Sequence, residues 1–125
     1  VVVLDNKEMT LNYAGAGDLP IFHKRNADGI VTKIESIGLL LGFNSDSHFE
    51  DTSIKMNKGD VVFLTTDGII ESLNVDGKQL GSKGLMEIIK NIDTNEPSIN
   101  SIKNQITRFT SEHFDDDVSL VMISS

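Results

Sequence analysis

The first part of the chain places short apolar stretches between polar turns, which is the pattern of β-strands. Residues 1–4 are apolar throughout, and Met9, Leu11 and Tyr13 put apolar side chains on one face of a second segment. The polar residues 5–8 between them predict a turn. We therefore expect these two strands to form a hairpin.

A second hairpin is predicted around residues 26–29, because the pair Asp28-Gly29 readily adopts the positive φ angles of tight hairpin turns. Its strands would be residues 21–24 and 30–35. The polar stretch at residues 44–53 predicts a surface excursion. Residues 61–64 follow, and because they are apolar on both faces we place them in a central strand.

The second half of the chain has helical periodicity. Apolar residues recur at spacings of three and four in two stretches, the first after Ser82, a candidate helix cap, and the second after Pro97. The first stretch contains Leu85, Ile88, Ile89 and Ile92, and the second contains Ile99, Ile102, Ile106 and Phe109. Residues 118–123 form a predicted terminal strand. The order of these elements, two hairpins, a central strand, two helices and a last strand, predicts an α+β fold with helices packed over antiparallel β-structure.

Length and composition limit the class of protein. With 125 residues, of which 38% are hydrophobic, the chain suits a single domain spanning residues 1–125. Its longest apolar runs are too short to cross a bilayer, so we expect no membrane contact. The absence of cysteine excludes disulfides, thiolate zinc sites and a cysteine nucleophile, and a cytoplasmic setting is the simplest expectation. Because the chain begins at Val1 without methionine, we expect sequence upstream of it.

Charge narrows the range of partners. Eleven Lys and Arg against nineteen Asp and Glu give a formal net charge of −8. Such a chain repels nucleic acid on average, so we expect no nucleic-acid partner. A basic partner or a cation fits this charge better.

The first candidate for chemistry is Asp67, in the segment Thr65-Thr66-Asp67-Gly68 directly after the predicted central strand. A carboxylate at the end of a buried strand is held rigidly, and Gly68 lets the backbone turn sharply beside a ligand. These features suit a metal ligand. The alternative is that Asp67 only caps a short helix starting near Gly68.

The second candidate is Asp115-Asp116-Asp117, directly before the predicted last strand. Adjacent carboxylates repel one another, and a divalent cation is a common way to stabilise them. The alternative is a solvated acidic turn. If the last strand pairs with the central one, the two acidic segments meet, and their oxygen ligands suit Mg²⁺ or Mn²⁺.

The three histidines do not form a recognisable metal-binding pattern. His23, His48 and His113 lack the spacing of a zinc motif, and we expect His23 to be a solvent-exposed strand residue without a functional role.

Several short motifs follow one another along the chain: Tyr13-Ala-Gly-Ala-Gly-Asp-Leu-Pro20, Gly38-Leu-Leu-Leu-Gly42, Lys58-Gly-Asp60, Thr65-Thr-Asp-Gly-Ile-Ile-Glu71, Gly81 and Asp116-Asp-Val-Ser-Leu120. In this order they resemble the motifs of bacterial SpoIIE/RsbU-type phosphatases, a branch of the metal-dependent protein serine/threonine phosphatases, the PPM family. The likeness spans essentially the whole chain and corresponds to the C-terminal portion of that domain. The resemblance implies antiparallel sheets with packed helices, as part of a four-layer αββα sandwich.

The resemblance also implies a function and a site. It implies hydrolysis of phosphoserine or phosphothreonine on a protein partner in bacterial signalling, such as an anti-sigma-factor antagonist, by a water activated at a two-metal centre of Mn²⁺ or Mg²⁺. The implied metal ligands are Asp67 and Asp116, with Gly68, Asp117 and Glu71 in supporting positions.

Two departures from the family pattern qualify that implication. Asp18 stands in a segment where the family usually has histidine, which marks a substrate-side loop that differs. The family's remaining metal aspartate precedes the strand with which this chain begins, so we expect weak or no catalysis by these residues alone. The alternative is a catalytically inactive phosphatase-like binding or regulatory module.

Overall fold

The structure is a computed structural model that describes residues 1–17, 19–35, 38, 40–42, 44–46 and 48–125. The strands are β1 (Val2–Asp5), β2 (Thr10–Tyr13), β3 (Ile21–Lys24), β4 (Val31–Ile34), β5 (Thr52–Lys55), β6 (Val61–Thr65) and β7 (Leu120–Ser124). The helices are α1 (Asp67–Ile70), α2 (Gly81–Lys90) and α3 (Ile99–Thr110). Within this part of the chain, no helix is long and apolar enough to cross a membrane.

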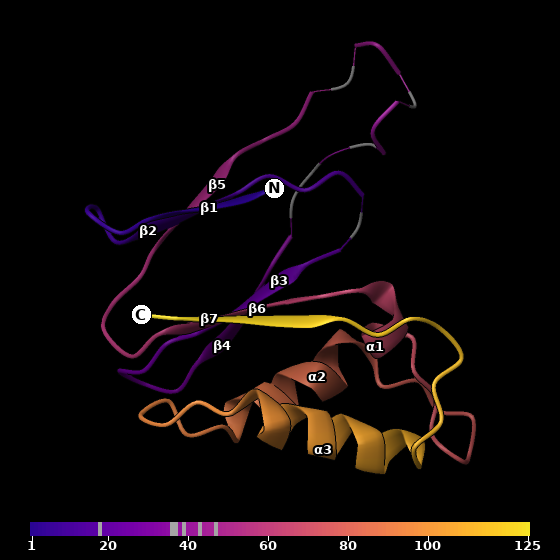
Figure 1. Cartoon of the computed structure of the whole chain (residues 1–125). Coiled ribbons are helices and arrows are strands. Elements are labelled where there is room, and N and C mark those ends of the chain that lie inside the picture. The colour runs from indigo at the N-terminus through magenta and orange to yellow at the C-terminus, as the bar shows by residue number, and fades with distance from the viewer. Residues whose placement is uncertain (18, 36–37, 39, 43, 47) are drawn as a thin grey trace.

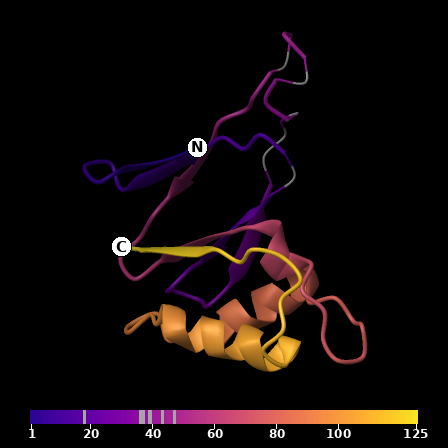
Figure 2. The ribbon, with the colours of Figure 1, turned by 45° about the vertical axis from the view of Figure 1, so that its right-hand side comes forward.

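The elements form three layers, two antiparallel sheets and a layer of helices (Figures 1 and 2). One sheet has the strand order β1-β2-β5 and the other has the order β4-β3-β6-β7. Helices α2 and α3 cover the face of the four-stranded sheet that points away from the three-stranded one. The fold is therefore α+β, as the sequence predicts.

The two strands at the centre of the larger sheet have apolar side chains on both faces, because each face supports a core. Between the sheets, Ile21 of β3 and Val62 of β6 pack with residues of the smaller sheet. That inter-sheet core also contains Leu11, Tyr13, Ile54 and Met56. Towards the helices, the core contains Phe22, Val61, Phe63, Ile69, Leu80, Leu85, Ile89, Ile92, Ile102 and Ile106.

Lys24, at the end of β3, anchors α2 to this sheet. Its side chain is buried, and its Nζ donates hydrogen bonds to the carbonyl oxygens of Ile89 at 3.2 Å, Lys90 at 2.8 Å and Ile92. The first two carbonyls lie in the last turn of α2, where intrahelical donors run out, and that of Ile92 lies just beyond the helix. Burial lowers the pKa of Lys24, although the nearby carboxylate of Asp93 acts in the opposite direction.

Several predictions of local structure are confirmed. The pairs β1 with β2 and β3 with β4 form the two expected hairpins, and β6 lies at the centre of its sheet. The last strand pairs with β6, with Thr65 opposite Leu120.

Two predictions are wrong. The expected surface excursion at residues 44–53 runs into β5, since Thr52 and Ser53 pair with β2, and the next residue of the strand, Ile54, lies in the core. Only one of its four side chains is both apolar and buried, so its alternation is too short to recognise. Ser82 does not cap α2, because the helix already begins at Gly81 and no side chain caps it.

Candidate metal centre

Asp67 lies where β6 leaves the sheet and α1 begins. The N-cap of α1 is Thr66, in an extended conformation, and Asp67 occupies the first turn. The Oδ1 atom of Asp67 accepts a hydrogen bond from the N–H of Gly68 at 3.0 Å, and its side chain is exposed. The capping position therefore belongs to Thr66, and the Asp67 carboxylate keeps lone pairs directed to solvent.

Thr66 joins this turn to the second acidic segment. Its Oγ1 donates to the carbonyl oxygen of Asp117 at 3.2 Å and accepts from the N–H of Ser119 at 3.0 Å. Its backbone N–H donates to the carbonyl oxygen of Ser119 at 3.1 Å. Three hydrogen bonds thus fix the segment before β7 to the end of β6.

Gly68 sets how closely the two segments approach. A Cβ atom at this position would lie 2.5 Å from the carbonyl oxygen of Asp117 and 3.5 Å from the Cβ of Asp116. The first distance is shorter than any contact that real Cβ atoms make, so a side chain here would displace backbone. The structure therefore brings the Asp67 turn and the Asp116 segment into direct contact, and the condition set for this, the pairing of the last strand with the central one, is fulfilled.

The carboxylates at this edge face water. Asp116 and Asp117 are exposed, and Asp116 Oδ1 accepts the N–H of Asp117 at 2.7 Å. Asp115 is separate from them, because its carboxylate pairs with His113 Nε2 at 3.1 Å. Within the described ranges, no cationic side chain forms an ion pair with Asp67, Asp116 or Asp117.

The described residues provide only part of a metal site. Among them, no group of three or more His, Cys, Asp or Glu side chains is arranged to hold a metal ion. Asp18, the predicted substrate-side residue, lies outside the described residues. The donor chemistry of Asp67 and Asp116 fits a hard divalent cation, but these two carboxylates leave most of its coordination to other ligands.

Glu71 lies one turn after Asp67, at the C-terminal end of α1. Both acidic residues line a hollow of about 330 Å³ together with Ala16, Gly17, Leu19, Leu40 and Ile70. The loop that forms its other wall is held by the hydroxyl of Tyr13, which donates to the carbonyl oxygen of Leu19 at 2.5 Å. Burial raises the pKa of Tyr13, which keeps this phenol protonated as a donor.

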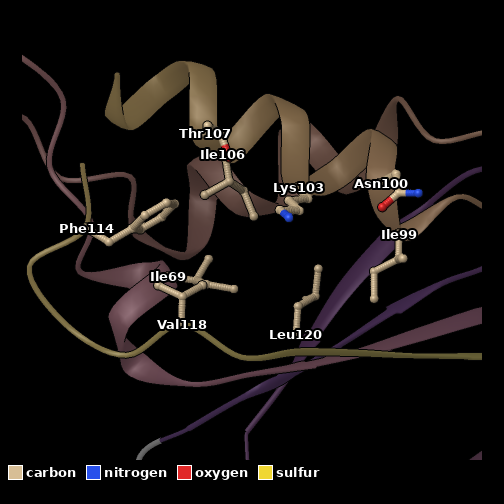
Figure 3. Close-up of a pocket in the computed structure, with 9 residues that line it drawn as sticks. All are labelled: Ile69, Ile99, Asn100, Lys103, Ile106, Thr107, Phe114, Val118 and Leu120. Carbon is tan, nitrogen blue, oxygen red and sulfur yellow. The ribbon is translucent and has the colours of Figure 1, made fainter. Parts of the chain in front are cut away.

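A second hollow, of about 370 Å³, lies behind the acidic segments, between α3 and the start of β7 (Figure 3). Ile69 and Val118, which directly follow Gly68 and Asp117, point into it. The remaining lining residues are Ile99, Asn100, Lys103, Ile106, Thr107, Phe114 and Leu120. Because this lining is mostly apolar and contains no acid, the hollow belongs to packing and not to the candidate metal centre.

The opposite end of β6 carries a polar cluster that the sequence analysis missed. His23 is only 7% exposed, so the prediction of an exposed histidine is wrong. Its Nε2 lies 3.1 Å from Oδ2 of Asp60, which is 1% exposed. Asp60 also accepts the backbone N–H of Asn26 at 2.8 Å and of Asn57 at 3.0 Å.

These contacts set the ionisation of Asp60. Burial by itself would raise the pKa of this carboxyl, but the two backbone donors and His23 outweigh it, so the pKa of Asp60 is lowered. The cluster joins three segments: strand β3 through His23, the turn between β3 and β4 through Asn26, and the turn before β6 through Asn57. Because it ties these segments together and lies at the end of β6 away from Asp67, we assign it a structural role.

Comparison with known proteins gives a family. The model of the family described as stage II sporulation protein E (SpoIIE) matches residues 1–125. Protein IcfG of Synechocystis is 26% identical over 127 residues, which cover 97% of this chain and 19% of that protein. Phosphoserine phosphatase RsbU of Bacillus subtilis is 25% identical over 122 residues, covering 96% of this chain and 36% of RsbU. The chain thus spans well under half the length of either relative.

Solved structures share the fold. The PP2C phosphatase domain of SpoIIE from Bacillus subtilis, solved with a fragment of its regulatory domain, has a TM-score of 0.81 at 22% identity, covering 97% of this chain and 35% of that one. The SiaA-PP2C domain of Pseudomonas aeruginosa also has a TM-score of 0.81, at 18% identity, covering 99% of this chain and 49% of that one. These likenesses support the assignment of the two sheets and their helices to a PP2C-type fold.

Proposed function

Because the chain belongs to the SpoIIE family, we propose that it forms part of a metal-dependent protein serine/threonine phosphatase domain that acts in bacterial signalling. The observation that supports this most strongly is the contact between the two acidic segments. Gly68 and Thr66 hold the Asp67 turn against the Asp116 segment at the edge of the larger sheet. Backbone segments fixed in this way place the two carboxylates at the same end of the sheet before an ion binds.

Asp67 and Asp116 are the proposed ligands, and Mn²⁺ or Mg²⁺ is the proposed ion. When bound, a pair of such ions lowers the pKa of a water and stabilises the charge that develops on a transferred phosphoryl group. The chain's own residues hold the ligands in place: Gly68 allows the close approach, and the main chain of Asp117 accepts the hydrogen bond from Thr66.

The substrate side of the proposed site is the hollow between α1 and the loop after β2. Glu71 is exposed and lines this hollow, where its proposed role is a supporting one, and Asp18 belongs to the loop after β2 by sequence. The proposed substrate is phosphoserine or phosphothreonine on a protein, such as an anti-sigma-factor antagonist. RsbU, named as a phosphoserine phosphatase, supports the class of reaction.

A second candidate function is a catalytically inactive binding module with the same fold. It is favoured by one observation, that the described residues contain no group of three potential metal ligands. Under this reading the chain binds a partner but releases no phosphate.

The first test is the melting temperature of the 125-residue chain with and without Mn²⁺ and Mg²⁺. An ion that binds only the folded chain must raise it, by an amount that grows with ion concentration. We expect a rise that Asp67→Asn and Asp116→Asn each abolish. Asp115→Asn is the matched control, because Asp115 adjoins Asp116 but pairs with His113, and this variant should keep the rise.

The second test is phosphate release from a phosphoserine peptide, measured with the same variants in a protein that also contains the parts of the domain its relatives have beyond these residues. Release that requires Mn²⁺ and is lost in Asp67→Asn supports the phosphatase. Metal binding without release, on every phosphopeptide tried, would favour the inactive module.

A further inference from the structure

The outer surface of the helix layer contains a groove that the proposed phosphatase site does not use. It has a volume of about 770 Å³ and lies between α2, α3 and the segment that leads into α2. Its lining residues are Lys78, Gln79, Leu80, Lys83, Gly84, Ile88, Gln105, Arg108 and Phe109. They come from three separate parts of the sequence, so only the folded chain forms this surface.

The charge of this groove is opposite to that of the whole chain. The chain has 19 acidic and 11 basic residues, yet the groove is lined by Lys78, Lys83 and Arg108 and, within the described residues, by no acid. All three cations are exposed. The ion pairs of the described chain involve His23, Arg25, Lys33 and His113 as cations, so none of these three is neutralised internally.

The floor of the groove is apolar. Leu80 is 8% exposed and belongs to the core, while Ile88 and Phe109 are half-buried at the core's margin. Gly84 contributes no side chain between them. A Cβ there would lie 2.8 Å from Cδ1 of Leu80, so the Leu80 side chain packs directly against the Gly84 backbone and forms this part of the floor.

We propose that this groove binds an acidic, amphipathic segment of a partner protein, with apolar side chains on Leu80, Ile88 and Phe109 and carboxylates beside the three cations. Cations around an apolar floor complement a segment that alternates Leu-type and Glu-type residues at helical spacing. The hollow of about 770 Å³ between the two helices leaves room for one peptide segment. The inference is independent of the proposed catalysis, because no groove residue belongs to the acidic segments.

The test uses a labelled synthetic peptide with leucine at helical spacing and glutamate at the remaining positions. Its binding to the 125-residue chain is followed by fluorescence anisotropy, beside a peptide with glutamine in place of every glutamate. We expect the glutamate peptide to bind about ten-fold more tightly at low salt, with the difference shrinking as salt rises.

Chain variants locate the binding surface. Lys83→Glu combined with Arg108→Glu should weaken binding of the glutamate peptide by about ten-fold or more, since attraction becomes repulsion. Arg108→Glu alone is compared with Lys103→Glu as its matched control, because both reverse one cation on α3 but Lys103 lines the hollow beside β7. If the charge-reversal variant has a lower melting temperature than the wild type, the variant Lys83→Gln with Arg108→Gln replaces it, because it removes the two charges without reversing them.

Three results would overturn the proposal: no binding of the glutamate peptide, equal binding of the two peptides, or equal weakening by the Lys103 control. Loss of Mn²⁺-dependent phosphate release would leave this test unaffected, so the two proposals fail separately.

Discussion

At the scale of single residues, Asp60 shows how a buried carboxylate can stabilise the fold. Its pKa is lowered in the folded chain, whereas the pKa of an aspartate in an unfolded chain is about 3.9. Its stabilisation is therefore complete above that value and is lost as the pH falls through the lower, folded pKa. We expect Asp60→Asn to reduce the free energy of unfolding by about 1–3 kcal/mol at neutral pH, because the new amide cannot accept from all three donors.

Urea unfolding at several pH values checks this. The difference in the free energy of unfolding between the wild type and Asp60→Asn should be constant near neutral pH and should shrink below about pH 4. Asp76→Asn, the same change on an exposed turn residue, should alter stability by less than about 0.5 kcal/mol at every pH. A difference for Asp60→Asn that does not vary with pH would show that its ionisation is not involved.

Lys24 supports a second prediction at this scale. Lys24→Met keeps the apolar stem but removes the donor to three carbonyl oxygens at the end of α2. We expect the last turn of α2 to lose protection in hydrogen exchange, with a stability loss of about 1–3 kcal/mol that relief of the buried charge partly offsets. Lys90→Met, at an exposed position of the same turn, should leave protection nearly unchanged; equal losses in both variants would contradict the anchoring role.

At the scale of elements, two helical glycines make a matched pair. Alanine normally stabilises a helix relative to glycine by about 0.5–1 kcal/mol. At Gly68 the added Cβ would meet the backbone of Asp117 at 2.5 Å, whereas at Gly84 it meets the flexible side chain of Leu80. We expect Gly68→Ala to cost about 1–3 kcal/mol and to weaken the Mn²⁺-dependent rise in melting temperature, because the loop must move.

Gly84→Ala should be neutral or stabilising by up to about 1 kcal/mol, since Leu80 can change rotamer. Thermal melts of both variants, each with and without Mn²⁺, test this contrast. Equal effects of the two substitutions would mean that the contact between α1 and the Asp117 segment does not constrain the backbone.

The elements also show what the sequence can and cannot predict. Helix α3 and the two hairpins follow from periodicity and turn residues, because each is encoded over a continuous stretch. The contact between the Asp67 turn and the Asp116 segment depends on the pairing of β7 with β6, which joins distant parts of the chain and which the sequence gives only as a condition. The burial of His23 cannot be predicted from the sequence pattern, because its partner Asp60 is 37 residues away and only the register of β3 with β6 brings the two together. Strand β5 was missed because its pairing with β2, and not its own pattern, makes it a strand.

At the scale of the whole molecule, the two cores share one sheet. Ile21 and Val62 face the smaller sheet while Phe22 and Phe63 face the helices, so neither core can form without β3 and β6. A chain built in this way should unfold in one cooperative step, as a single domain spanning residues 1–125. Independent units would instead require separate strands for each core.

Two core substitutions test this coupling. Leu11→Ala opens the inter-sheet core and Ile102→Ala opens the helix-side core, and both side chains are fully buried. Each should cost about 2–5 kcal/mol, and each should lower the midpoint of the same single transition, seen identically by helix circular dichroism and by calorimetry. If Leu11→Ala shifted only part of the heat absorption and left the helical signal at its original midpoint, the smaller sheet would be a separate unit. A single shifted transition in both variants would show that the sheet whose strands β6 and β7 lead to Asp67 and Asp116 is stabilised from both faces, which keeps the Asp67 turn in contact with the Asp116 segment.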